Sequence, residues 1–299
     1  MSLALTILPI ALAIAVGWAA RAAGVIRAEH WPGIEALSFR VLGPALMVHA
    51  IAGADLSLSR IGPFGAALLA TIALTGGAVL LLGRRTGGAA LSTLFQSTIR
   101  YNGYVSLAVA DLMIGAAGMS LIAVSMAVMV PVVNVACIVV LVLLCSGETG
   151  PRRIARAVAA NPLVLGAAAG IAVNLAGGLP DWAMDTLQLV GRAALGVALL
   201  AVGAGLQLRR LLLVRPLVVA GLALRPFAVT GVFVGLAAAF GLSALETLAG
   251  ILIFAVPSAS NGFIVARAMG GDADLYADLL AWQVLLCLVA IPAYVALAT

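Results

Sequence analysis

Charged residues are scarce in this 299-residue sequence, and lysine is missing altogether. Asp, Glu, Lys and Arg together make up only 9% of the chain, whereas 64% is hydrophobic and the mean hydropathy is +1.22. In a soluble domain about a quarter of the residues are charged and about half are apolar. A soluble fold could not bury this much apolar surface. The composition therefore predicts an integral membrane protein that is solvated by the lipid bilayer.

Residue types that carry catalysis or bind metals are also few. The two histidines, His30 and His49, are far apart, and there is no His-Glu-x-x-His, Gly-x-Ser-x-Gly or P-loop motif. The three cysteines lie in apolar segments, which is typical of packing residues. We therefore expect no enzyme activity, no metal site and no cofactor. The net charge of +5 does not indicate a nucleic-acid partner, because the arginines form short clusters between apolar runs.

Apolar runs follow one another along the whole chain, and most are close to the roughly 20 residues that a transmembrane helix needs. Glycine, proline and charged residues separate them. The pattern predicts an all-α integral membrane protein with ten transmembrane helices. The first is expected to be retained rather than cleaved, because residues 1–20 contain no basic residue. The predicted spans are 3–20, 33–53, 61–83, 89–115, 117–145, 162–178, 186–207, 216–240, 246–268 and 276–298.

The arginines are concentrated in every second connection between the predicted spans. Most follow the odd-numbered spans, whereas only Arg60 follows an even-numbered one. Because cytoplasmic loops are enriched in arginine, we expect the odd-numbered connections to be cytoplasmic and both termini to lie outside the cytoplasm, in a multi-pass protein of the cell membrane. The arginines predicted to be cytoplasmic are Arg21, Arg27, Arg84, Arg85, Arg152, Arg153, Arg156, Arg209, Arg210, Arg215 and Arg267.

The two halves of the sequence resemble each other. The matched pairs include Pro9 with Pro162, Gly17 with Gly170, Pro63 with Pro216, Arg40 with Arg192, and Asn102 with Asn261. Because five is an odd number, a second copy of a five-span unit must enter the membrane from the opposite face. The sequence thus predicts two inverted five-helix repeats, 1–147 and 162–299, joined by a cytoplasmic basic linker, 148–161. This architecture is typical of secondary transporters.

Spans four and nine are each interrupted by polar and helix-breaking residues. Residues 96–103 read QSTIRYNG, and residues 257–262 read PSASNG. Proline removes a backbone donor and glycine relaxes a helix, and backbone groups freed at membrane depth need protein or a water-filled cavity around them. Breaks at equivalent places in two repeats predict a substrate site where the broken helices cross. The alternative is a simple proline kink, with serine and asparagine bonding neighbouring helices.

Several motifs are shared with a known family. They are Leu8-Pro9 with Gly17 and Gly24, Pro44 in span two, and above all residues 256–267, VPSASNGFIVAR, followed by Gly270-Gly271-Asp272. Through them the chain resembles the auxin efflux carrier family, including its bacterial organic-acid and malonate permeases. The family often has a proline at the break of span four, and none occurs here between Arg100 and Leu112.

The resemblance implies a scaffold of spans 1, 2, 6 and 7 and a transport domain of spans 3–5 and 8–10, in which spans four and nine cross. It also implies carboxylate substrates that bind beside the crossing, and homodimerisation through the scaffold spans. Asn102 and Asn261 fall on or near the binding positions of the family.

Substrate-binding residues are therefore expected at the two breaks. We expect hydrogen bonds from Asn102, Ser258, Ser260 and Asn261, breaks shaped by Gly103, Pro257 and Gly262, and attraction of negative charge by Arg100. The alternative for Arg100 is a structural pairing with backbone carbonyls of the broken helix.

Other charged residues inside spans need an explanation, because charge is costly in a membrane. Asp111 and Arg225 are candidates for coupling transport to an ion. Asp111 lies about 12 Å beyond the break of span four, near the outer interface. Arg225 either faces the cavity or ties span eight to a carbonyl of a broken helix. Arg40 and Arg192 are interpreted as snorkelling or packing residues.

Together these features predict a secondary transporter of small organic anions that works by alternating access at the crossing of spans four and nine. A sodium-coupled symporter of the bile-acid type shares the crossed-helix plan, because sodium sites use backbone carbonyls and hydroxyls. A non-transporting membrane sensor is the other alternative. The sequence leaves the coupling ion, a proton or sodium, open.

Overall fold

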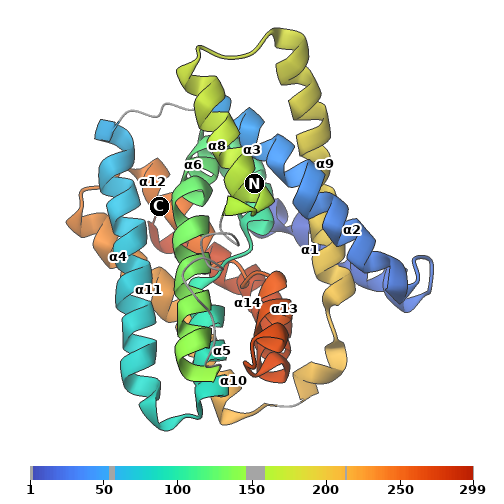
Figure 1. Cartoon of the computed structure of the whole chain (residues 1–299), viewed down its shortest axis with the longest axis vertical. Coiled ribbons are helices and arrows are strands. Elements are labelled where there is room, and N and C mark those ends of the chain that lie inside the picture. Colours follow the sequence, from blue (N-terminus) through green and yellow to red (C-terminus); the bar gives the residue numbers. More distant parts are fainter. Residues whose placement is uncertain (1–2, 54–57, 146–158, 213, 299) are drawn as a thin grey trace. The chain divides into compact units, whose positions relative to one another are not determined.

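The computed structural model describes residues 3–53, 58–145, 159–212 and 214–298, and these residues form helices and short connections without a β-strand (Figure 1). The predicted all-α fold is therefore confirmed for the described part of the chain. Apart from residues 159–161, the predicted linker 148–161 lies outside the described residues, and so do Arg152, Arg153 and Arg156.

Six helical segments of the described chain are long and apolar enough to cross a membrane by length and composition: Ala28–Ala52, Gly62–Arg85, Gly88–Cys145, Asp181–Gly205, Pro216–Ala239 and Ala273–Leu297. Three shorter apolar helices, Leu8–Ala22, Pro162–Leu175 and Ala244–Phe254, lie within or close to further predicted spans. The segment Gly88–Cys145 covers two predicted spans and contains Gly115, whose φ of 61° interrupts the helix. The chain is thus a multi-span membrane protein, whereas the count of ten spans in two inverted repeats stays a prediction.

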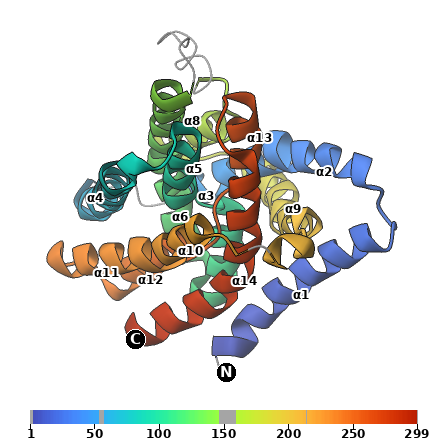
Figure 2. The ribbon, with the colours of Figure 1, turned by 90° about the horizontal axis from the view of Figure 1, so that it is seen from below.

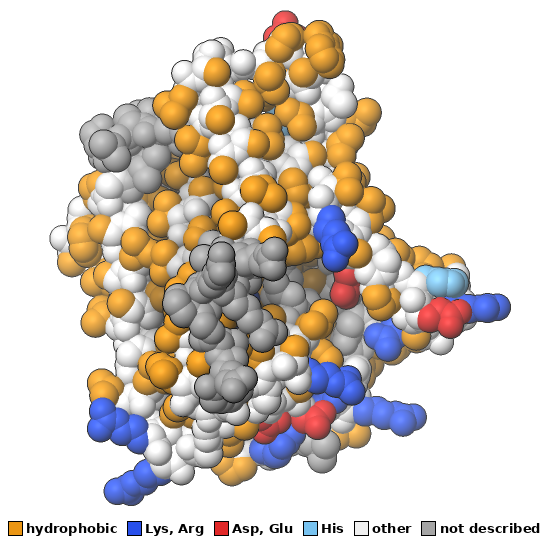
Figure 3. Space-filling model, in the orientation of Figure 1, with side chains coloured by type: hydrophobic (Ala, Val, Ile, Leu, Met, Phe, Trp, Pro, Cys, Tyr) orange, Lys and Arg blue, Asp and Glu red, His pale blue; other side chains and the backbone are white. Residues whose placement is uncertain are grey.

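Large apolar side chains are exposed along these helices. Leu82, Leu189 and Leu297 are 85%, 77% and 82% exposed, and hydrophobic side chains are scattered over the face drawn in Figure 3. A soluble monomer rarely exposes large continuous apolar patches. The surface therefore fits the inference from composition that lipid covers the helices.

The chain separates into two compact units, and the long helix α6 (Gly103–Cys145) contributes to both. The first unit comprises Met1–Ser57, Gly103–Val130 and Ala159–Leu206. The second comprises Leu58–Asn102, Pro131–Val158 and Gln207–Thr299. Whether these units act as a scaffold and a transport domain stays a prediction.

In the first unit, α1 (Leu3–Ala22) packs along α9 (Asp181–Gly205), and α3 (Gly43–Ala52) packs against α8 (Pro162–Leu175). Glycine permits the close approach of α1 to α9, since a Cβ on Gly203 would lie 1.8 Å from the carbonyl oxygen of Ile14. The remaining helical segments of this unit are Ala28–His30, α2 (Trp31–Leu37) and the π-helical turn Ser38–Leu42.

In the second unit, α4 (Leu58–Leu82) packs against α5 (Gly88–Ile99) and α11 (Val229–Ala239), and α11 packs against α12 (Ala244–Phe254), as Figures 1 and 2 show. The ring centroid of Phe233 lies 6.5 Å from that of Phe64 and 5.4 Å from that of Phe254. These aromatic contacts connect α4, α11 and α12. The other helical segments of this unit are Gly83–Arg85, Leu208–Leu212, α10 (Pro216–Leu222), Ala223–Ala228, α13 (Asn261–Ala268) and α14 (Ala273–Ala298).

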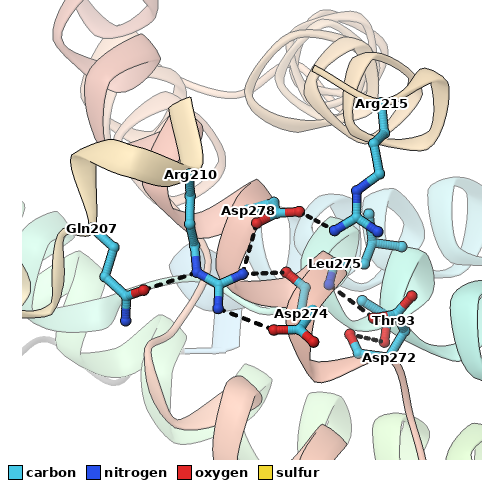
Figure 4. Close-up of polar contacts among 8 residues, drawn as sticks. All are labelled: Thr93, Gln207, Arg210, Arg215, Asp272, Asp274, Leu275 and Asp278. Carbon is cyan, nitrogen blue, oxygen red and sulfur yellow. Dashed lines mark hydrogen bonds and ion pairs between the residues drawn. The ribbon is translucent and has the colours of Figure 1, made fainter. Parts of the chain in front are cut away.

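An ion-pair cluster connects Arg210 and Arg215 to the first turns of α14 (Figure 4). Asp278 is fully buried, and its two carboxylate oxygens accept hydrogen bonds from Arg210, at 2.8 Å, and from Arg215. Arg210 also donates to the carboxylate of Asp274 at 3.0 Å and to Gln207 at 3.0 Å. The hydrogen bond to Asp278 raises the pKa of the Arg210 guanidinium above its ordinary value. The charge of Asp278 is thus matched within the fold.

Asp278→Asn is expected to lower the free energy of unfolding by about 2–3 kcal/mol, because it weakens two charge-assisted hydrogen bonds at a buried position. Arg209→Ala is the control, since Arg209 is exposed beside Arg210 and has no hydrogen bond or ion pair within the described residues. It should change stability by less than about 0.5 kcal/mol. Thermal unfolding of the detergent-solubilised variants measures both, and equal melting temperatures would contradict the structural role of Asp278.

Candidate functional site

The structure has a helix break at each place where the sequence predicts one. Helix α5 ends at Ile99 and α6 begins at Gly103, while α12 ends at Phe254 and α13 begins at Asn261. The two breaks are in contact, because the backbone N–H of Asn102 donates to the carbonyl oxygen of Pro257 at 2.9 Å. Residues that are far apart in the sequence therefore meet where the helices are interrupted.

Arg225 ties the two breaks together from a third helix. Its side chain is fully buried and donates to the carbonyl oxygens of Val256 at 2.9 Å, Thr98 at 2.9 Å and Ile253 at 2.8 Å. Carbonyls at the C-terminal end of a helix have no partner within it, and a cation there is favoured by the helix dipole. Arg225 thus satisfies the ends of α5 and α12, which is the structural role considered for it from the sequence.

Arg100 carries a second buried charge at the break of α5. It is 4% exposed, its Nε donates to Oε1 of Gln96 at 3.3 Å, and its Nη1 donates to Oδ1 of Asn134 at 2.9 Å. Both partners are neutral amides rather than the backbone carbonyls considered above. No carboxylate of the described residues forms an ion pair with Arg100. A buried charge without a counter-ion is costly, which makes this position a candidate for binding an anion.

Helix α14 holds the backbone of the second break with two side chains. Oε1 of Gln283 accepts a hydrogen bond from the backbone N–H of Ser258 at 3.0 Å, and the hydroxyl of Tyr276 donates to the carbonyl of Ala259 at 2.7 Å. Tyr276 also lies directly against Gly262, where an added Cβ would be 2.1 Å from its hydroxyl oxygen. Gly262 is therefore required for close packing of the tyrosine against the break.

The predicted site residues differ in exposure. Asn102 is 6% exposed, and Ser258 is fully buried. Pro257 and Gly262 are also buried, Ser260 is half-buried, and Asn261 is exposed as the first residue of α13. The structure thus brings Arg100, Asn102, Pro257 and Ser258 together where the two helix breaks meet, within the second unit.

The two remaining predicted residues lie on the part of α6 that belongs to the first unit. Gly103 begins this helix, and a Cβ on it would lie 2.4 Å from Cε of Met126. Asp111 is exposed on the same helix and forms no ion pair with any described residue. Its surroundings give its proposed coupling role no support.

Four residues that bond the two breaks were not predicted: Gln96, Asn134, Tyr276 and Gln283. A signal for Gln283 was present, because it is a polar residue within the apolar run LLAWQVLLCL of span ten. Polar residues inside a transmembrane span are costly and usually face protein or a cavity. Asn134 is likewise a polar residue within an apolar run, in span five.

Comparison with known families gives a match to the second half of the chain. Residues 151–295 match a family model described as membrane transport protein. These residues are just under half of the chain, and through them the chain is similar to the membrane transport protein family. This is the family of the auxin efflux carriers, as the shared motifs predicted, and its members are membrane transporters rather than enzymes. The matched part of the chain contains Arg225 and the break at 257–262. No curated protein matches the chain.

Proposed function

We propose that the protein is a secondary transporter of small organic anions, with carboxylates as its substrates, and that the anion binds at the crossing of the two helix breaks. The observation that carries this proposal is Arg100, which is buried at the break and held by two neutral amides without a carboxylate partner among the described residues. Its guanidinium fork suits the two oxygens of a carboxylate.

The balance of charge at the crossing supports an anion. Arg100 and Arg225 are both buried there, whereas Asp278, the buried acid among the described residues of the same unit, is paired with Arg210 and Arg215. Two positive charges in a medium of low dielectric constant attract an anion more strongly than they would in water. A cationic substrate at this position would be repelled.

The helix starts at the breaks also favour negative charge. Helix α6 begins at Gly103 and α13 begins at Asn261, so each break presents the positive end of a helix dipole and backbone N–H groups. The residues proposed to bind substrate or to shape its site are Arg100, Asn102, Gly103, Pro257, Ser258, Ser260, Asn261 and Gly262.

Alternating access is the mechanism that these features favour. The division of the chain into two compact units supports it, because a carrier needs parts that change their relation to the membrane while the site keeps its geometry. The hydrogen bonds of Arg225 to both breaks would preserve that geometry during the movement.

Uptake into proteoliposomes of a panel of labelled mono- and dicarboxylates tests the function. Wild type is expected to show saturable uptake. Arg100→Gln should raise KM by about 10- to 100-fold, because hydrogen bonds to charged groups are worth about 1.5–3 kcal/mol. Arg192→Gln is the control and should behave as wild type, since Arg192 is an exposed arginine of α9.

Each outcome of this experiment is informative. Proton and sodium gradients applied separately identify the coupling ion, and strict dependence on sodium would favour the sodium-coupled symporter. Binding of an acid without flux would favour the sensor and overturn the carrier. An unchanged KM in Arg100→Gln would contradict the proposal that Arg100 binds the anion. The absence of uptake of any acid by folded wild type would overturn the proposed function.

A further inference from the structure

Two glutamines at the crossing each have a buried amide nitrogen without a hydrogen-bond partner among the described residues. They are Gln96 on α5 and Gln283 on α14, and both side chains are fully buried. The two helices pack against each other within the second unit. The great majority of buried polar atoms in natural proteins do have a partner, so an exception calls for a physical reason.

The orientation of each amide is fixed by the donor that its oxygen faces. Oε1 of Gln96 accepts a hydrogen bond from Nε of Arg100, and Oε1 of Gln283 accepts one from the backbone N–H of Ser258. Turning either amide over would place its NH2 group against another donor. The amide oxygens therefore accept hydrogen bonds from the residues of the two breaks, and the amide nitrogens remain without a partner among the described residues.

Neighbouring polar side chains on α5 do not share this property. The hydroxyls of Ser97 and Thr98 both donate to the carbonyl of Leu94, at 3.1 Å and 2.7 Å. A leucine or methionine at either position would remove the unpaired nitrogen, but it would leave Nε of Arg100 or the backbone N–H of Ser258 without this acceptor. Within the described residues, Gln96 is therefore the one side chain of α5 with an unpaired buried polar atom, whereas on α14 Nε1 of Trp282 is unpaired as well as the nitrogen of Gln283.

The chemistry of these groups defines their ligand. An amide NH2 and a guanidinium only donate hydrogen bonds, so the complementary group has oxygens that only accept them, as a deprotonated carboxylate or a sulfonate does. A carboxamide or a protonated acid presents hydrogens to the same donors and should be rejected. The glutamines would thus select for the charged form of the substrate.

We propose that Gln96 and Gln283 hold the helix breaks with their amide oxygens and bind the transported anion with their amide nitrogens. This inference rests on the proposed function. Because both nitrogens are buried in this structure, the anion reaches them in an open conformation of the same site. The two residues then determine specificity in addition to Arg100.

Gln283→Glu tests the inference, because glutamate has the same shape and keeps an oxygen for the N–H of Ser258 while it replaces the NH2 donor by an acceptor. The probe is the labelled carboxylate that wild type takes up fastest in the panel above. At about pH 7 the variant should lose about tenfold or more in kcat/KM. The ratio of variant to wild type should recover toward about pH 5, as the glutamate is protonated and regains a donor.

Gln96→Glu should show the same loss, because its carboxylate would also neutralise Arg100. Gln188→Glu is the matched control, since Gln188 lies on α9 of the first unit and makes no hydrogen bond within the described chain. It should keep wild-type uptake. Ethanesulfonate should compete with the probe in wild type and propionamide should not.

The outcomes separate this inference from the function on which it rests. Wild-type uptake by Gln283→Glu at every pH would overturn the inference and leave the carrier intact. A loss that does not recover at low pH and comes with a lower melting temperature would show a purely structural glutamine and overturn it as well. No uptake of any acid by wild type would overturn the carrier itself.

Discussion

Arg225→Leu is expected to prevent stable folding of the second unit rather than only to slow transport. The substitution removes three hydrogen bonds from a fully buried guanidinium and leaves the carbonyls of Thr98, Ile253 and Val256 without this partner. At about 1.5–3 kcal/mol for each bond to a charged group, the loss exceeds about 4 kcal/mol. Whole domains are stable by only about 5–15 kcal/mol.

Arg225→Lys should fail almost as severely. A lysine ammonium is a compact point charge, whereas the three carbonyls lie on two broken helices and are reached by three different nitrogens of the planar guanidinium. The measurement is the yield and melting temperature of monodisperse protein in detergent. Arg192→Leu is the control, and melting temperatures of Arg225→Leu and Arg192→Leu that agree would contradict the role given to Arg225.

Gly262→Ala is expected to abolish transport through the geometry of the second break. The new Cβ would lie 2.1 Å from the hydroxyl oxygen and 2.2 Å from Cζ of Tyr276, which is fully buried and cannot move without giving up its bond to Ala259. Overpacking of this kind costs about 1–3 kcal/mol. The distortion falls on the residues proposed to bind substrate, so uptake should fall more steeply than stability.

Two comparisons test this expectation for Gly262. Gly235→Ala on α11 has the same chemistry but nothing within 4 Å of the new Cβ, so it should keep uptake and stability. In a Tyr276→Leu background, Gly262→Ala should cost less than it does in wild type, because the clashing ring is gone. Equal costs in both backgrounds would show that the tyrosine is not the cause.

The positions of the helix breaks could be predicted from the sequence because their causes are local. Pro257 and Gly262 weaken the helix where they stand, and the polar run from Gln96 to Gly103 is conspicuous within an apolar span. The end of α5 at Ile99 and the start of α13 at Asn261 follow directly from these residues. The structural role of Arg225 could also be predicted, because a buried arginine needs several hydrogen-bond acceptors.

The partners of the site residues could not be predicted in the same way. Gln283 bonds Ser258 across 25 residues and Asn134 bonds Arg100 across 34, so both contacts depend on how the helices pack. Hydropathy shows that a polar residue lies in a span but not which neighbour it meets. The π-helical turn at Ser38–Leu42 was not predicted, although Pro44 follows it closely and cannot donate a backbone hydrogen bond to the carbonyl of Arg40.

The bond from Arg225 to Thr98 spans 127 residues and has a consequence for biosynthesis. Thr98 belongs to the half of the chain that leaves the ribosome first, and its carbonyl lies at the end of a helix that has to sit in the membrane. Until residue 225 has been translated, this helix end lacks the side chain that completes it. The first half should therefore be an incompletely folded intermediate that insertion chaperones and quality-control proteases recognise. Truncated chains that stop before Arg225 should be degraded rather than accumulate.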